Sequence, residues 1–111
     1  MAGMPVGAQD GRLSPQDIQA AWVGKTVVGI IGSGPSAGNS IEFKMNADGT
    51  AAVSGAAVDT GTWRLSELGY CATWKKIRSG QERCFTVIRK GSEQQVINPD
   101  GSVNTKLTQI R

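Results

Sequence analysis

The sequence predicts a mainly β protein, an antiparallel eight-stranded meander that closes into a small barrel, with one short N-terminal helix. Three observations lead to this fold. After residue 24, short apolar runs follow one another, turn signals rich in glycine separate them, and no helical crossover lies between them. With 15 glycines in 111 residues, tight turns can join the strands. Closure removes exposed strand edges, while a strongly bent sheet capped by the helix is the alternative.

The length suits one domain, which we place at residues 14–111. A chain of this size buries roughly 65% of its unfolded surface and forms a modest core. Apolar residues make up 39% and charged residues 19%, a composition that excludes a disordered chain. No apolar run approaches the ~20 residues that a membrane-spanning helix needs, so we expect no transmembrane segment.

Residues 1–13 show neither a helical nor a strand period, and we expect them to form a flexible tail. Within it, residues 6–8 place small side chains at positions −3 and −1 of a possible signal-peptidase cut before Gln9. The tail would then be a signal-peptide remnant, because the charged and apolar regions of a whole signal peptide are missing. A Gly/Ala-rich tail without this role is the alternative.

A helix is expected over residues 15–22. Ser14 can accept a hydrogen bond as N-cap, and Pro15 suits the first helical position because its missing N–H needs no partner there. Asp17 can reach back to the cap as in a capping box. The apolar face of this helix ends in Trp22, which we expect to anchor the core while the helix covers one end of the sheet.

Eight strands are expected after the helix, at residues 25–31, 39–46, 50–55, 61–66, 70–76, 82–89, 93–98 and 102–110. Alternation is clear in the second of them, where Ile41, Phe43 and Met45 would face inward and Glu42 and Lys44 would face solvent. The same period turns inward Trp63, Leu65, Phe85, Val87, Val103, Thr105 and Leu107.

The closed form of such a meander is typical of small lipocalin-like (calycin-like) barrels. Barrels of eight strands either hold one small ligand or are filled by their own side chains. The chain has three tryptophans, one tyrosine and two phenylalanines, and this short supply favours a filled interior. A pocket at the barrel mouth near Trp63 and Trp74 is the alternative.

Two cysteines, Cys71 and Cys84, flank an expected hairpin. A disulfide across it would stabilise the fold by roughly 3 kcal/mol and would require an oxidising compartment. Two buried free thiols in a cytosolic protein are the alternative. If the cysteines face each other directly, Tyr70 lies opposite Phe85, the loop covers about residues 76–79, and the disulfide lies on the outer face.

A GTW element, a CxxW element and an RC-aromatic element follow one another along the chain, within runs at residues 24–29, 48–50, 61–65, 71–74 and 83–87. Over residues 14–101, these motifs resemble a family of small exported proteobacterial proteins of unknown function. It implies export, to the periplasm or the outside, and a compact β domain with a paired disulfide. It implies no catalytic residue.

The absence of histidine excludes Ser-His-Asp and Cys-His catalysis and histidine metal sites. Two cysteines do not make a four-ligand zinc site, so we expect no metal and no cofactor. The glycine-rich run at residues 32–38 lacks the Lys-Ser/Thr and the helix of a phosphate-binding loop. Asp48 and Asp100 each precede a glycine as in a calcium loop, but turn chemistry accounts for them.

The carboxylates in or beside turns show no spacing typical of a glycosidase pair; they are Asp59, Glu67, Glu82 and Glu93. Charge is uneven instead. Residues 75–90 hold six lysines and arginines against one glutamate, a net charge of +5, whereas the rest of the chain carries −2. A protruding basic hairpin of this kind can contact an anionic surface, or its lysines can simply keep a strand edge soluble.

The candidate binding residues are those of the basic hairpin and the barrel mouth, namely Lys75, Lys76, Arg78, Arg83, Trp63 and Trp74. The leading hypothesis is an exported, non-catalytic barrel that binds an unidentified protein or small molecule. The first alternative is a periplasmic or secreted inhibitor of a protease or lysozyme. A nucleic-acid-binding barrel is the second, if the protein is cytosolic, since export makes nucleic acid an unsuitable partner. A hydrolase built on turn carboxylates is the third.

Overall fold

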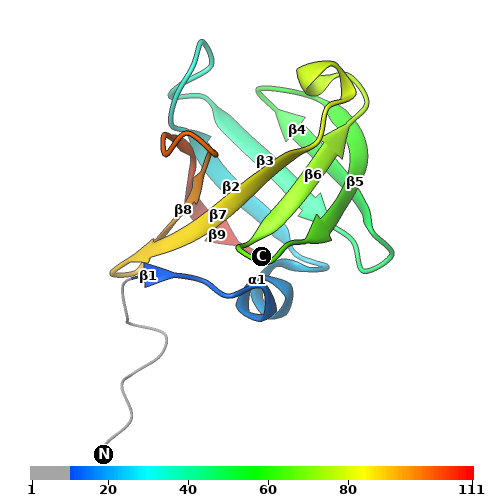
Figure 1. Cartoon of the computed structure of the whole chain (residues 1–111). Helices are drawn as coiled ribbons and strands as arrows, with labels where there is room; N and C mark the ends of the chain where they lie inside the picture. Colours follow the sequence, from blue (N-terminus) through cyan, green and yellow to red (C-terminus); the bar gives the residue numbers. More distant parts are fainter. Residues whose placement is uncertain (1–10) are drawn as a thin grey trace, which may run out of the picture.

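The computed structural model describes residues 11–111. Eight antiparallel strands form a closed barrel in the order β2-β3-β4-β5-β6-β7-β8-β9, and β9 returns to β2 (Figure 1). The elements are β1 (Gly11–Arg12), α1 (Pro15–Trp22), β2 (Thr26–Ile31), β3 (Ser40–Met45), β4 (Thr50–Gly55), β5 (Asp59–Leu65), β6 (Tyr70–Trp74), η2 (Ile77–Gly80), β7 (Arg83–Lys90), β8 (Glu93–Ile97) and β9 (Val103–Ile110). The predicted closed barrel is therefore confirmed.

The eight expected strands are all present, with ends that differ from the prediction by at most two residues. The alternation in β3 follows the prediction, since Met45 is buried and Phe43 packs against the core, whereas Lys44 is exposed. None of the helices in residues 11–111 has the length and apolar character to cross a membrane.

Helix α1 closes one end of the barrel (Figure 1). Its capping box forms as predicted: the Ser14 hydroxyl accepts from the Asp17 backbone N–H at 3.1 Å, and the Ser14 backbone N–H donates to the Asp17 carboxylate at 3.3 Å. Ile18 and Trp22 are fully buried. The indole N–H of Trp22 donates to the side-chain oxygen of Gln94 at 3.1 Å, which ties the helix to β8.

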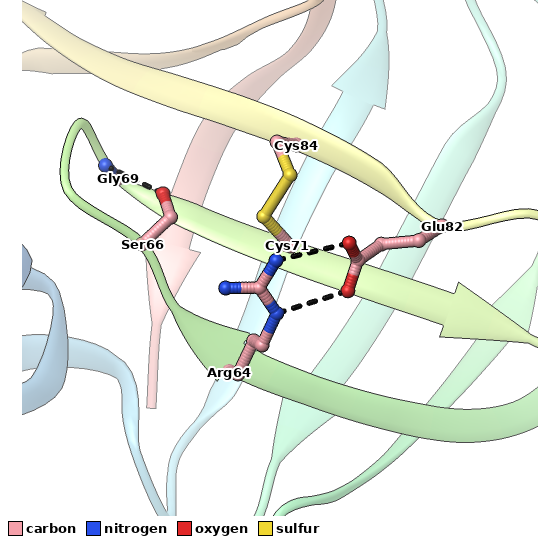
Figure 2. Close-up of polar contacts among 6 residues, drawn as sticks. All are labelled: Arg64, Ser66, Gly69, Cys71, Glu82 and Cys84. Atoms are coloured by element: carbon pink, nitrogen blue, oxygen red, sulfur yellow. Dashed lines mark hydrogen bonds and ion pairs between the residues drawn. A yellow bond between two sulfur atoms is a disulfide. The ribbon is translucent and has the colours of Figure 1, made fainter.

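The register of β6 and β7 is also as predicted. Tyr70 pairs with Phe85 and Cys71 pairs with Cys84, whose sulfur atoms are joined in a disulfide. Figure 2 shows this bridge crossing from β6 to β7 on the outer face of the barrel. Beside it, the guanidinium of Arg64 donates two hydrogen bonds of 3.0 Å to the carboxylate of Glu82.

Strand β1 differs from the expected flexible tail. Strand β6 pairs with β7 only as far as Phe85, and beyond that point β1 pairs with β7 at Ile88 and Arg89. Leu13, the last residue of the expected tail, donates its backbone N–H to Val87 at 2.8 Å and is buried in the core. The expectation therefore does not hold for residues 11–13. The possible cut before Gln9 lies outside the described residues.

Candidate functional site

The end of the barrel opposite α1 holds an apolar cavity of about 200 Å³. The strands β2, β4, β6 and β8 run toward this end, so the loops that follow them surround its mouth (Figure 1). Six of the lining residues come from six strands: Ile31, Phe43, Val53, Trp63, Ala72 and Phe85. The expectation of a filled interior is correct next to the helix and wrong at the mouth.

An aromatic cluster forms the floor of the cavity. The ring of Trp22 meets Phe43 and Tyr70 edge-on, each with centroids 5.6 Å apart, and Tyr70 lies 5.2 Å from Phe85. Edge-to-face contacts of this kind add to the stabilisation from burial alone. Because Phe43, Tyr70 and Phe85 also line the cavity, the helix supports its floor through Trp22.

The two tryptophans predicted near the mouth, Trp63 and Trp74, line the same cavity. The indole N–H of Trp63 donates to the backbone carbonyl of Asn46 at 2.8 Å, so its polar atom is satisfied within the protein. Both rings are half-buried and pack against the core, and they present apolar surface to the cavity.

Arg78 occupies a different place from the one that its position in a basic hairpin suggests. Its guanidinium lies over the Phe85 ring, 5.4 Å from the centroid, and it lines the cavity. One guanidinium nitrogen, Nη1, is buried and has no hydrogen-bond partner. The backbone of Arg78 has φ 54° and ψ 33°, a left-handed conformation that is uncommon outside glycine, asparagine and aspartate. Such backbone outliers concentrate at functional sites.

The surroundings of Arg78 do not favour its positive charge. Burial lowers the pKa of the Arg78 guanidinium, and the positive charge of Arg83 lowers this pKa further. Burial raises the pKa of the Tyr70 hydroxyl, while the charge of Arg78 acts in the opposite direction. Within residues 11–111, no aspartate or glutamate lines the cavity to offset the arginine.

Asp59 holds the loop that carries Arg78. Its carboxylate accepts the backbone N–H groups of Lys76 and Ile77 at 2.8 and 3.0 Å, and that of Thr60 at 2.8 Å. The hydrogen bond from Ile77 is the main cause that lowers the pKa of Asp59, and the bonds from Lys76 and Thr60 add to it against the opposing effect of burial.

The loop between β6 and β7 is longer than the predicted residues 76–79. Trp74 pairs with Gly61 of β5 rather than with β7, so the connection extends to β7 at residue 83.

We expect Asp59→Asn to destabilise the protein at neutral pH. The folded-state pKa of Asp59 lies below its ordinary value of 3.8, so its contribution is present above that value and is lost as the pH falls through the folded-state pKa. Urea unfolding of the protein and the variant should therefore differ at pH 7 and converge near pH 2. Faster hydrogen exchange of the Lys76 and Ile77 amides should accompany the loss. Glu67→Gln, an equal change of charge at an exposed site, is the control. A difference that persists unchanged at pH 2 would contradict this role.

The other predicted cations do not reach the cavity. Lys75 and Lys76 are exposed on the loop. Arg83 pairs with Ala72 at the rim, close enough to Arg78 and to Asp100 to affect the pKa of both. The structure thus brings Arg78 together with the two tryptophans and leaves the lysines in solvent. Tyr70 was not among the predicted binding residues. It lines the cavity because it pairs with Phe85, which faces inward, and directly paired residues lie on the same face of a sheet.

The remaining polar motifs have local structural partners. The Asp48 carboxylate accepts from the backbone N–H of Thr50 at 3.0 Å, and Asp100 accepts from that of Ser102 at 2.9 Å, so both form turns as predicted. Glu93 accepts from the side chain of Gln95 at 2.7 Å.

Ligand atoms of Cys71, Glu82 and Cys84 lie within 4.8 Å of one another. Thiolates are the form in which cysteine binds metals, and both sulfur atoms are consumed by the disulfide. The oxidised protein therefore does not offer these residues as a metal site.

Comparison of the chain with protein families, with curated proteins and with solved structures finds no match. The resemblance to small exported proteins stays a prediction.

Proposed function

We propose that this protein is an exported, non-catalytic barrel that binds a small molecule in its interior. The observation that carries the proposal is the apolar cavity at the open end of the barrel. Binding sites for small molecules are concave and mostly apolar, with a few polar groups that orient the ligand, and the mouths of β-barrels are a common place for them. The cavity matches this description, since most of its lining is apolar and its charged lining residues are Arg78 and Lys44.

The non-catalytic part of the proposal rests on the residues available for chemistry. The chain contains no histidine. Of the four carboxylates considered for acid–base catalysis, Asp59 binds backbone N–H groups, Glu82 pairs with Arg64 and Glu93 accepts from Gln95. These partners give the three carboxylates a structural role outside the cavity, and Glu67 is exposed and does not line it.

Export is supported by the disulfide between Cys71 and Cys84. Disulfides form and persist in oxidising compartments such as the bacterial periplasm and the extracellular space, and are rare in the cytosol. A periplasmic or secreted location would place the barrel where small molecules enter the cell or leave it.

Binding of 1-octanol, an uncharged apolar probe, tests the proposed function. We expect saturable binding by calorimetry, with chemical-shift changes confined to residues that line the cavity. Ala51→Phe should weaken binding about tenfold or more, which corresponds to ~1.4 kcal/mol, because Ala51 is buried and lines the cavity. The added ring would occupy the space that the probe needs.

The control is Ala52→Phe. Ala52 is the next residue of β4 and is exposed on the outer face, so the same substitution there should leave octanol binding unchanged. Circular dichroism would verify that both variants fold, since overpacking commonly destabilises a core by about 1–3 kcal/mol. Equal effects of the two substitutions, or no binding by the parent protein, would contradict the proposed function.

A further inference from the structure

Arg78 is costly to the isolated protein. A guanidinium carries five N–H donors, and a buried donor without an acceptor loses its hydration without compensation. The Nη1 nitrogen is in this state, and the contact between the guanidinium and the Phe85 ring satisfies charge but accepts no hydrogen bond in the plane of the group. The site therefore lacks an acceptor beside Arg78.

The missing acceptor is not supplied by the surrounding protein. Among the described residues that line the cavity there is no carboxylate, and another cation, Arg83, lowers the pKa of Arg78. Glu82 and Asp59 lie on the same loop or at its base, but Arg64 occupies the first and backbone N–H groups occupy the second. No carboxylate in the described lining is therefore a partner for Arg78, and an incoming anion would supply one.

A second donor faces the same space. Tyr70 is buried and lines the same cavity as Arg78. It lies close enough to Arg78 for each group to affect the pKa of the other. An oxyanion beside Nη1 of Arg78 could therefore accept from the tyrosine hydroxyl as well.

The rest of the ligand is defined by the cavity walls. The apolar walls of the cavity include Phe43, Trp63 and Trp74. At about 30 Å³ for each water-sized group, the cavity of about 200 Å³ has room for roughly seven such groups. This suits the alkyl part of a medium-chain molecule or a single substituted ring and is too small for a long lipid.

We infer that the ligand is a small amphipathic anion, such as a medium-chain carboxylate, whose head group binds Arg78 and Tyr70 while its apolar part lies inside the barrel. This inference rests on the proposed function and specifies its ligand class. Arginine and a carboxylate can form two parallel hydrogen bonds, which would satisfy Nη1 and fix the orientation of the ligand.

The test compares three probes of equal chain length: octanoate, 1-octanol and octylammonium. Hydrogen bonds to charged groups are stronger than neutral ones, so octanoate should bind the parent protein roughly 10- to 100-fold more tightly than 1-octanol. Octylammonium should bind more weakly than either. Calorimetry at neutral pH and low salt gives the three affinities.

Arg78→Gln should lower the affinity for octanoate much more than the affinity for 1-octanol, so that the preference for octanoate is lost. Lys75→Gln removes the same charge from an exposed position on the same loop, so it serves as the matched control and should preserve the preference for octanoate. Tyr70→Phe should reduce the octanoate affinity by a smaller factor, and Arg78→Lys should retain part of the preference.

The outcomes separate the two proposals. If 1-octanol binds in the cavity and octanoate binds no more tightly, the anionic ligand class is wrong while the proposed function stands. The same conclusion follows if Lys75→Gln removes the preference as fully as Arg78→Gln does. If no probe binds, both proposals are wrong. If Arg78→Gln fails to fold, Arg78→Lys and Tyr70→Phe provide the measurement.

Discussion

Trp22→Ala is expected to lower the free energy of unfolding by about 3–5 kcal/mol, the range for deletion of a buried aromatic side chain. The ring is fully buried at the helix end of the barrel, where it contacts Phe43 and Tyr70. The substitution also leaves the Gln94 amide without the indole N–H that it accepts. Because small domains have a stability of only 5–15 kcal/mol, the loss is a large share of the total.

Urea unfolding followed by circular dichroism measures this effect. Trp22→Phe keeps part of the ring and should be less destabilising, which provides a graded result if the alanine variant does not fold. Trp74→Ala, at a half-buried ring beside the mouth, is the matched control and should have a clearly smaller effect. A loss below about 1 kcal/mol for Trp22→Ala would mean that α1 does not support the barrel in the way described.

Removal of the Cys71–Cys84 disulfide is expected to lower the free energy of unfolding by about 3 kcal/mol. The bridge closes a loop with a sequence separation of 13 residues, and three residue pairs join β6 to β7. Without it, the unfolded chain gains freedom and the loop that carries Arg78 loses its covalent support. Urea unfolding with and without reductant measures the difference.

The double variant Cys71→Ala/Cys84→Ala is the control for the reductant itself. Its stability should match that of the reduced protein and should not respond to reductant. The intact mass of protein recovered from its native cells, with and without alkylation, shows which state the cell maintains. A mass lower than the reduced value by two hydrogens, with no alkylation, is expected. Two alkylatable thiols would contradict the proposed export.

The fold was predictable where neighbouring residues determine the structure. Ser14 and Asp17 specify the helix start within four residues, and the period of two in Ile41, Phe43 and Met45 specifies both the strand and its inner face. The cysteine pair added a long-range constraint, which is why the register of β6 and β7 could be predicted in advance.

The site was predictable only in part. Trp63 and Trp74 belong to strands whose inner faces follow from alternation. Arg78 does not, because its inward position depends on a left-handed backbone and on an anchor, Asp59, that lies on another strand. A cluster of lysines and arginines in a loop has the same appearance in sequence whether one of them enters the protein or none does. Strand β1 was missed for a related reason, since two residues become a strand only where β7 offers an unpaired edge.

The closing strand β9 has a consequence for how the protein is made. The barrel strands from β2 to β8 each pair with the next strand along the chain, so each hairpin can form soon after it is synthesised. Strand β2 must wait for β9, whose Thr108 contacts Val28 across a separation of 80 residues. Until β9 leaves the ribosome, β2 and β8 each present a free edge to other chains. The nascent protein is therefore most prone to aggregation just before β9 emerges, and chaperones that cover strand edges would act at that stage.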